Sequence, residues 1–491
     1  MRMNINQGQL LQRVGLQSRP ILRAALAVAS VAFLNSCGGG SRPPAYSISG
    51  NVTGLASGAS LVLVNNGGNP IAITSNSSFM FSTRITTGEA YDVTIETQPP
   101  YQGCSVRGGT GTVANMDVSN VQIDCPLVTQ IKDFGYGEDA DYPQSGMIAA
   151  SDGTFFGTSE YGGSTAQGAI YHVNSQGVES LYASFGEAPA SAGPCGQLLQ
   201  VADGSFYGTT YWGGTNNSGS VFHLTTDTVI HTVWSFGSGS DGSYPVTNLI
   251  LGSDGNLYGT TGSGGTSGYG TFFRLTLDGT ETVLWNFGIG PDGSEPGNLV
   301  DGGDGFLYGT TSFGGSGGYG TVFKITLTGT ETVLWKFSQD GAEGDVPGPG
   351  LTKGTDGNFY GTTQSGTNGS LGSFFKITPA GALTVVWAFH GTTGAEGPFS
   401  QVIQASDGNF YGTSGLGGTV DICDNGQGAG CGTIFKITPA GEETVLWSFG
   451  FGTNGSWSNP LGLVEAAPGI FYGVSKSGGS VGSGTLFQLQ L

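Results

Sequence analysis

"SDGNLYGTTGSGGTSGYG", residues Ser253 to Gly270, carries the pattern that decides the fold. Leu257 and Tyr258 form a short apolar stretch between an Asp-Gly pair and a glycine-rich loop. Asp-Gly is a strong turn signal, and short apolar stretches between turn signals are typical of β-strands. Similar stretches recur about every 51 residues along the chain. The aromatic residue before the glycine is found at Phe156, Tyr207, Tyr258, Tyr308, Tyr360, Tyr411 and Tyr472.

Each repeat contains the same four apolar stretches in the same order. From Asn248 to Phe287 they read "NLILGS", "NLYGTT", "GTFFRLT" and "TVLWNF", with Asp-Gly turns and a glycine-rich loop between them. Four short strands repeated at about 40 to 50 residues are typical of a β-propeller blade. The pattern therefore predicts an all-β chain in which residues 127–491 form seven blades.

The two ends of the repeat region complement each other. The last repeat stops at "GTLFQLQL" and has no fourth strand, whereas "VTQIKDFG", Val128 to Gly135, precedes the first complete repeat. We expect this N-terminal strand to complete the last blade and to close the ring. Closure removes the exposed sheet edges that would otherwise pair with other chains.

A smaller all-β domain is expected before the propeller, over residues 46–126. "YSISGNV", "ASLVLVNN" and "YDVTIETQP" alternate apolar and polar residues, and Gly and Asn separate them. Such alternation predicts strands with one buried face, which suits a small β-sandwich. Nothing in this segment has the pattern of a catalytic site.

Residues 1–36 are predicted to be an export signal. Arginines precede an apolar run from Ala24 to Phe33, which is too short to remain as a membrane span. The run ends at Leu34-Asn35-Ser36-Cys37, which resembles the lipobox of bacterial lipoproteins, although Asn35 departs from the small residue usual there. The resemblance implies cleavage before a lipidated Cys37, a flexible tether over residues 37–45 and, because Gly38 follows, the outer membrane. A plain signal peptide with a chance cysteine is the alternative.

The charge of the chain excludes some partners. The sequence has 15 Lys and Arg and 35 Asp and Glu, and the leader contains four of the arginines and no acid. The mature chain therefore has a formal charge of 11 − 35 = −24. Such a surface repels nucleic acids and anionic lipids and favours cations or neutral ligands.

Residues 46–126 resemble an Ig-like module common near the N-termini of bacterial exported proteins. The resemblance implies that Cys104 and Cys125 are paired, and Cys423 and Cys431 are expected to close a second disulfide in an inserted loop. Two disulfides agree with an oxidising compartment. Cys195 is left over and has no histidine near it in the sequence, so a structural thiol is favoured over a nucleophile.

The repeat itself, "SDGNLYGTTxxGGxxGYGTxFxLTxxGTETVLWxF", resembles the GloVer tandem repeat of bacterial exported proteins. The resemblance covers residues 127–491 and implies a repeat fold and a place at the cell envelope. It implies no activity. The layout is also similar to that of NHL-repeat propellers.

Several residue types recur at fixed repeat positions, and each has a structural interpretation. The aspartate before the turn glycine suggests calcium or the Asp-box of sialidases, but a turn cap is favoured because glycine follows it directly. A basic or polar residue in the third strand and a tryptophan in the fourth are best explained by packing. The repeated aspartates are Asp152, Asp203, Asp254, Asp304, Asp356 and Asp407. The basic or polar residues of the third strand are His172, His223, Arg274, Lys324, Lys376, Lys436 and Gln488. The tryptophans of the fourth strand are Trp234, Trp285, Trp335, Trp387 and Trp447.

Binding residues are therefore expected where the repeats differ. The loops between strands two and three and those between blades are predicted to share one face, which collects acids and aromatic residues. This combination suits sugar rings, a cationic group or calcium, and solvated loops with no ligand are the alternative. The candidates are Asp139, Asp141, Tyr161, Tyr211, Trp212, Tyr269, Tyr319, Asp421, Asp424 and Trp457.

The leading hypothesis is a monomeric, lipid-anchored envelope protein whose propeller binds a glycan or a surface protein without turnover. No catalytic residue is assigned, because no nucleophile motif or metal-ligand spacing is present in the sequence. Calcium is the one cofactor considered. A polysaccharide hydrolase or lyase with two facing carboxylates is the alternative enzyme hypothesis, and a purely structural envelope protein is a third.

Overall fold

The computed structural model describes residues 43–491 except 57, 100–101, 136–138, 187–190, 289, 339–342, 367–370, 391–393, 399, 419–429 and 451–459. The described chain is all β, as predicted, and contains no helix in those ranges. Consequently none of its described segments is a helix able to cross a membrane. The predicted leader, Cys37 and most of the predicted tether lie outside the described residues.

Residues 45–124 form two four-stranded sheets and a short ribbon of β1 and β6. One sheet has the order β5-β2-β10-β8, with β2 and β10 parallel, and the other has the order β4-β3-β7-β9. Alternate residues of β2 and β7 are buried, so both sheets contribute to one core. The strands are β1 (Ala45–Tyr46), β2 (Ile48–Thr53), β3 (Leu61–Asn65), β4 (Gly68–Ile73), β5 (Ser78–Met80), β6 (Ile85–Thr86), β7 (Ala90–Thr97), β8 (Ser105–Arg107), β9 (Thr110–Thr112) and β10 (Val118–Asp124).

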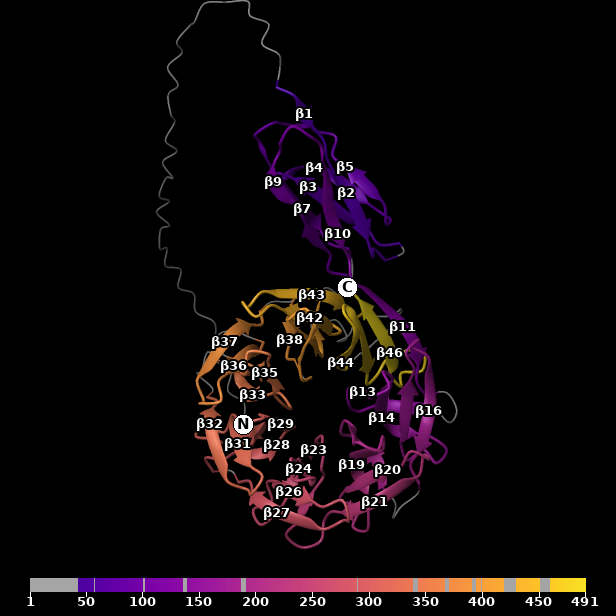
Figure 1. The fold of residues 1–491 in the computed structure, drawn as a ribbon, viewed down its shortest axis with the longest axis vertical. Coiled ribbons are helices and arrows are strands. Elements are labelled where there is room, and N and C mark those ends of the chain that lie inside the picture. The colour runs from indigo at the N-terminus through magenta and orange to yellow at the C-terminus, as the bar shows by residue number, and fades with distance from the viewer. Residues whose placement is uncertain are drawn as a thin grey trace, which may run out of the picture. The chain divides into compact units, whose positions relative to one another are not determined.

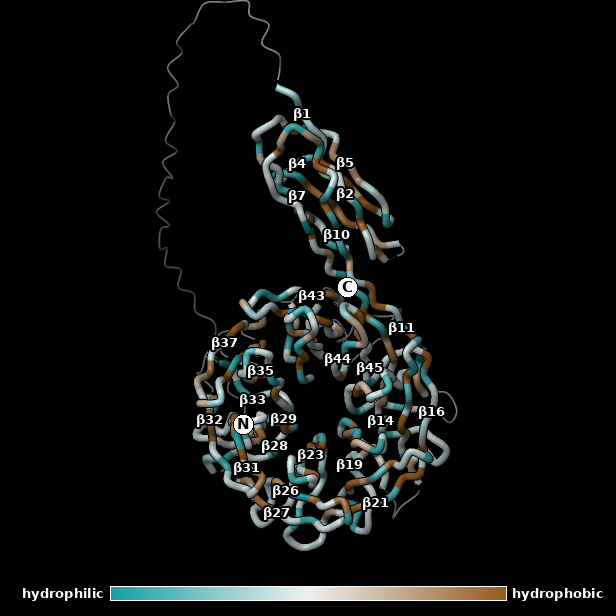
Figure 2. Tube along the Cα trace, in the orientation of Figure 1, coloured by the Kyte–Doolittle hydropathy of each residue, from teal (hydrophilic) through white to brown (hydrophobic). Residues whose placement is uncertain are grey.

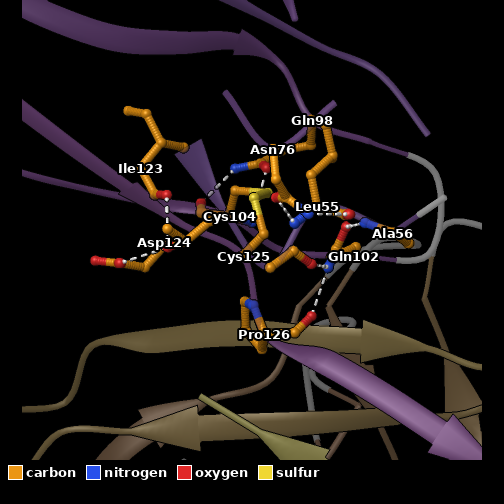
Figure 3. Close-up of a disulfide and its surroundings, with 12 residues drawn as sticks. Leu55, Ala56, Asn76, Gln98, Gln102, Cys104, Ile123, Asp124, Cys125 and Pro126 are labelled. Atoms are coloured by element: carbon orange, nitrogen blue, oxygen red, sulfur yellow. Dashed lines mark hydrogen bonds between the residues drawn. A yellow bond between two sulfur atoms is a disulfide. The ribbon is translucent and has the colours of Figure 1, made fainter. Parts of the chain in front are cut away.

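A disulfide between Cys104 and Cys125 closes the end of these sheets, as the Ig-like resemblance implied. The side chain of Gln98 accepts a hydrogen bond from the Cys104 N–H and donates one to its carbonyl, both at 2.9 Å. Gln102 Nε2 donates to the carbonyls of Gly54 and Pro126 at 2.7 and 2.6 Å (Figure 3). The chain around the disulfide is therefore held by side-chain amides as well as by the covalent bond.

The remaining strands form a series of antiparallel sheets, each following the order of the four predicted strands. The inner edge of each complete sheet is split into two short strands or replaced by a small ribbon. The first half contains β12 (Ala140–Pro143), β13 (Ile148–Ala149), β14 (Phe155–Gly162), β15 (Ala169–Val173), β16 (Glu179–Ser184), β17 (Ser191–Pro194), β18 (Leu199–Gln200), β19 (Phe206–Gly213), β20 (Ser220–Leu224), β21 (Ile230–Ser235), β22 (Gly242–Ser243), β23 (Ile250–Leu251), β24 (Leu257–Thr261), β25 (Ser263–Gly264), β26 (Thr271–Leu275) and β27 (Glu281–Asn286).

Figure 1 shows these sheets arranged around a common centre, with the fourth strands such as β27, β32 and β37 on the outside. The second half contains β28 (Ser294–Pro296), β29 (Val300–Asp301), β30 (Phe306–Phe313), β31 (Thr321–Thr326), β32 (Glu331–Lys336), β33 (Asp345–Pro347), β34 (Thr352–Lys353), β35 (Phe359–Ser365), β36 (Ser373–Ile377), β37 (Leu383–Ala388), β38 (Ala395–Glu396), β39 (Ile403–Gln404), β40 (Phe410–Ser414), β41 (Leu416–Gly417), β42 (Thr433–Ile437), β43 (Glu443–Ser448), β44 (Pro460–Ala467), β45 (Ile470–Ser475) and β46 (Thr485–Gln490).

The last sheet is built from both ends of the repeat region. Its order is β11-β46-β45-β44, and β11 (Leu127–Asp133) pairs antiparallel with β46. Thr129 lies opposite Gln488 in this pairing. The expected partnership between the segment at Val128 and the final strand is therefore present.

The core of the repeat region lies between neighbouring sheets, where the apolar segments of Figure 2 meet. At each boundary a phenylalanine from one sheet contacts an aromatic ring of the next with centroids 5.0 to 5.5 Å apart, a favourable separation for aromatic pairs. In five of these pairs the phenylalanine lies two residues after the repeated tryptophan. Phe236, Phe287, Phe337, Phe389 and Phe449 are fully buried, whereas tryptophans such as Trp285 are half-buried beside them.

Candidate functional site

A cavity of about 540 Å³ lies where the inner segments of successive sheets converge. Its wall includes residues from Gln144–Gly146 near β12 through to Pro460–Leu463 in β44, so every sheet contributes to it. Side-chain amides are its most frequent polar groups. They are Gln144, Gln197, Asn248, Asn298 and Gln401.

A proline at the start of each inner segment places these amides. The residue before the proline has a positive φ, of 55° at Tyr142, 56° at Tyr244 and 54° at Glu295. This left-handed conformation is uncommon for residues with a side chain. The backbone N–H of each donates to a carbonyl in the loop between strands two and three of the preceding sheet. For Tyr244 the acceptor is Ser218, at 2.8 Å.

These hydrogen bonds place the loop between strands two and three of one sheet against the connection into the next sheet. The predicted sharing of one face by these two kinds of loop is therefore confirmed where the bonds occur. Glu295 N donates to Tyr269 O at 3.1 Å, which adds another example. Glu295, which lies in one of these connections, also belongs to the wall of the cavity.

The amides in the cavity are only partly paired with the protein. Asn298 Oδ1 accepts a hydrogen bond from Asn248 N at 3.0 Å, and Gln401 Nε2 donates to Leu351 O at 2.7 Å. Asn248 Oδ1 is buried and has no hydrogen-bond partner. A buried acceptor without a partner costs free energy, so Asn248 Oδ1 is an unsatisfied group beside the cavity.

Few charged groups reach the cavity. Glu295 is the one carboxylate among the described residues of the wall. Elsewhere in the wall, Gln144 Oε1 accepts a hydrogen bond from Lys476 Nζ at 3.0 Å, and Gln144 Nε2 donates one to Glu160 Oε2. The opposite charges of Lys476 and Glu160 are thus linked through one amide. The described wall is therefore close to neutral, whereas the whole chain is strongly acidic.

Cys195 lies in the same wall and is a free thiol. Its Sγ contacts the Pro245 carbonyl at 3.5 Å. Burial raises the pKa of this thiol to about 12. Because the thiolate is the nucleophile, we expect Cys195 to react slowly near neutral pH.

Three aromatic residues, of which Trp212 is exposed, form a cluster on the loop face. Tyr211 and Trp212, at the end of β19, meet Tyr244, which enters the next sheet. Tyr211 stacks on Tyr244 with centroids 4.8 Å apart, and Trp212 packs edge-on against Tyr211 at 4.5 Å. The Trp212 side chain remains 39% exposed. We call Tyr211, Trp212 and Tyr244 the aromatic cluster.

The other predicted binding residues are more scattered. Tyr161 is 44% exposed and packs edge-on against Tyr142 at 5.9 Å, and Asp141 pairs with Tyr161 across the strands. Tyr269 is exposed, whereas Tyr319 is partly buried against the core. Asp139 forms an ion pair with Lys132 at 2.8 Å.

Four predicted residues, Asp421, Asp424, Trp457 and Cys423, lie outside the described residues. The pairing of Cys423 with Cys431 therefore stays a prediction. Sequence analysis missed Tyr142, Tyr244 and the cavity amides. Their signal in the sequence is the repeated proline, from Pro143 to Pro460: the tyrosines directly precede it, and the amides follow it by one to three residues.

The repeated aspartates cap turns, as the residue pattern favoured. Asp254 accepts hydrogen bonds from Asn256 N at 3.2 Å and from the Tyr258 hydroxyl at 2.9 Å. Asp304, Asp356 and Asp407 accept the same tyrosine hydrogen bond. The described residues contain no group of three or more His, Cys, Asp or Glu arranged to hold a metal ion.

The family model for the Gloeobacter/Verrucomicrobia repeat matches residues 100–302 and 279–487. The chain belongs to this repeat family. The matches cover both the first and the last described sheets of the Gloeobacter/Verrucomicrobia repeat region. No curated protein matches the sequence.

Solved structures with a similar arrangement share little sequence with this Gloeobacter/Verrucomicrobia repeat protein. A gluconolactonase from Xanthomonas campestris is 13% identical, with a TM-score of 0.37 over 74% of this chain and 100% of its own. The PQQ-bound aldose sugar dehydrogenase from Streptomyces coelicolor is 13% identical, with a TM-score of 0.38 over 74% and 98%. A puromycin hydrolase is 11% identical, with a TM-score of 0.45 over 69% and 50%.

Proposed function

We propose that this protein is a lipid-anchored envelope protein whose propeller binds carbohydrate without turning it over. In this proposal the sheets of residues 127–491 are seven blades, closed by β11, and residues 46–126 are an Ig-like spacer. The aromatic cluster is the observation that carries the binding function. Tyr211 and Tyr244 are held in a stack, and Trp212 beside them keeps 39% of its surface exposed.

The chemistry of the loop face suits a neutral, hydroxyl-rich ligand. Aromatic rings with an apolar face and a polar edge accept the C–H face of a sugar, while amides bond its hydroxyl groups. The cavity supplies such amides, among them Gln144, Gln197 and Gln401. An anionic ligand is disfavoured, because the mature chain carries a formal charge of 11 − 35 = −24.

The number of carboxylates in the cavity wall favours binding of a glycan over its hydrolysis. Glycoside hydrolysis commonly uses two carboxyl groups about 5 to 10 Å apart, one on each side of the scissile bond. The described wall contains one, Glu295. We therefore assign no catalytic residue, and we place recognition at the aromatic cluster and the adjoining cavity.

A glycan array with soluble protein from Ser41 to Leu491 tests this proposal, in calcium and in EDTA. We expect a defined sugar to bind and Trp212→Ala to weaken that binding about tenfold or more, since stacking on an exposed indole is lost. Phe313→Ala is the matched control. It removes an exposed aromatic side chain from the same strand position of another sheet, where no tyrosine pair adjoins it.

Two outcomes would contradict the binding proposal. A blank array in both buffers would exclude carbohydrate and leave a surface protein as the partner to seek. Equal losses in Trp212→Ala and Phe313→Ala would remove the special role of the cluster. The anchor is tested separately, because Cys37→Ser should abolish metabolic labelling with palmitate and release the protein from membranes.

A further inference from the structure

The boundary between the last and the first sheet contains two carboxylates and one cation. Lys132 of β11 forms ion pairs with Asp139 at 2.8 Å and with Glu179 at 2.6 Å. Its contact with Glu179 is close but lacks the angles of a hydrogen bond. The Glu179 side chain is fully buried, so its charge depends on this ammonium group.

Two other boundaries have the same pair of carboxylates. Glu281 lies opposite Leu275 and Glu331 opposite Ile325, the register that Glu179 has with Val173. Asp241 and Asp292 precede the repeated proline by four residues, as Asp139 does. These boundaries thus carry the pairs Asp241–Glu281 and Asp292–Glu331.

The position of the lysine is different at those two boundaries. Lys132 lies opposite Leu486 in the third strand of its sheet. The corresponding residues are Trp234, opposite Val221, and Trp285, opposite Phe272. An indole therefore stands where the first boundary has an ammonium group, and each acid pair lacks that counter-charge.

The oxygens of these pairs are incompletely bonded. Asp241 is 8% exposed; its Oδ1 accepts the Gly237 N–H at 3.1 Å, and its Oδ2 is buried without a hydrogen-bond partner. Glu281 Oε1 and Glu331 Oε1 are also buried and unpartnered.

A third kind of boundary shows that one acid needs no cation. Gly394 replaces the aspartate before β38, and Glu443 alone remains. Trp387 Nε1 donates to Glu443 Oε2 at 3.1 Å, and Ala395 N donates to Oε1 at 3.0 Å. The indole N–H groups of Trp234 and Trp285 are buried without a hydrogen-bond partner, and so is that of Trp335, at a boundary where Leu383 takes the place of the glutamate.

We propose that Asp241–Glu281 and Asp292–Glu331 each bind one calcium ion, which takes the place that Lys132 Nζ fills at the first boundary. Carboxylate oxygens are hard ligands, and a divalent cation matches the charge of two carboxylates. Main-chain carbonyls and water complete the oxygen coordination that calcium requires. Asp241 lies three residues before Tyr244 of the aromatic cluster, whereas the pair Asp292–Glu331 shares no residue with that cluster.

Terbium luminescence tests the sites in the soluble protein, because Tb³⁺ replaces Ca²⁺ and is excited through a nearby indole. Trp234 and Trp285 provide that indole. We expect sensitised emission that calcium displaces and that falls by about half in Asp241→Asn/Glu281→Gln, since one of two oxygen sites is lost. Asp292→Asn/Glu331→Gln should remove the other half. Glu443→Gln, the matched control at a boundary with one acid, should leave the emission unchanged.

A substitution that creates a further calcium site gives a test that does not depend on a loss of signal, which misfolding could also cause. Lys132→Trp gives the first boundary the residues of the other two, and we expect one more bound ion and stronger sensitised emission. Emission that is absent from the wild type, or unchanged in both double variants, would overturn the proposal. No gain in Lys132→Trp would do the same. If a double variant fails to fold, Glu281→Gln alone must weaken the emission.

Discussion

The hydroxyl of Thr209 donates a hydrogen bond of 2.9 Å to the backbone carbonyl of Thr247, across the boundary between two neighbouring sheets. Both residues are buried. The same bond recurs at other boundaries, from Thr260 to Gly297, from Thr310 to Gly348 and from Thr413 to Pro460. Val474 holds the equivalent position in the last sheet, so the boundary with the first sheet has no such donor.

Replacing Thr209 by valine should destabilise the repeat region by about 1 to 3 kcal/mol, because a buried carbonyl loses its partner. Valine keeps the shape of threonine, so packing is little changed. Urea unfolding followed by tryptophan fluorescence measures the difference. Thr209→Ser keeps the hydroxyl and is the control; a loss in Thr209→Ser with none in Thr209→Val would show that the methyl group matters and the hydrogen bond does not.

Glu443 should make stability fall with rising pH. Burial raises its pKa, and hydrogen bonds from Ala395 N and Trp387 only partly offset that rise. The folded protein therefore keeps this proton when the unfolded chain, near pH 4.5, has already lost it. The free energy of unfolding is highest below that pH and falls as pH rises through the raised pKa of Glu443.

Glu443→Gln should flatten this part of the pH profile. Urea midpoints at pH 4.5, 6, 7 and 8 provide the comparison, and the difference between variant and wild type isolates Glu443 from the other acids. The glutamine can accept only one of the two hydrogen bonds at a time, so a loss that is constant with pH is also expected. A difference with no pH dependence at all would contradict the buried carboxylate.

Cys195 should react slowly with thiol reagents. Since burial raises its pKa to about 12, the thiolate fraction at pH 8 is on the order of 10⁻⁴. We expect labelling by Ellman's reagent to be at least about a hundredfold slower in the folded protein than in urea. Cys195→Ser supplies the background. Rapid labelling of the native protein would show that the cavity wall exposes this thiol.

Reducing the Cys104–Cys125 disulfide should destabilise residues 45–124 by about 3 kcal/mol, as expected for closing a loop of this length in the unfolded chain. Hydrogen exchange with and without reductant measures the effect. Amides of β2 and β10 should exchange faster after reduction, whereas those of β26 and β31 should not change. Faster exchange throughout both regions would mean that the two parts unfold together.

The strands and turns could be predicted because the same sequence pattern recurs in each repeat. Each repeat has an equivalent of the Asp254-Gly255 turn, of "NLYGTT" and of "TVLWNF" at the same place. Agreement between repeats therefore supported each strand assignment without any knowledge of contacts between residues distant in the sequence. The partnership of β11 with β46 followed from one missing and one surplus strand. Local patterns were sufficient for these features.

The candidate site could be predicted only in part, because its residues come from different repeats. Tyr211 and Trp212 were identified as exposed aromatics, but Tyr244 joins them from the next sheet. The cavity amides are ordinary polar residues until several inner segments converge. Likewise, Lys132 is explained only by Asp139 and Glu179, whose nearness depends on the boundary between two sheets.

The pairing of Thr129 with Gln488 sets an order for folding during synthesis. Every complete sheet from β12 to β43 joins strands that are close in the chain, so each can form soon after it leaves the ribosome. The last sheet must wait until residues 485–490 have been made, and until then β11 is an unpaired strand. Such long-range closure is slow and leaves apolar edges open to other chains. A chaperone that shields β11 should therefore raise the yield of native protein more than one that acts on the middle sheets.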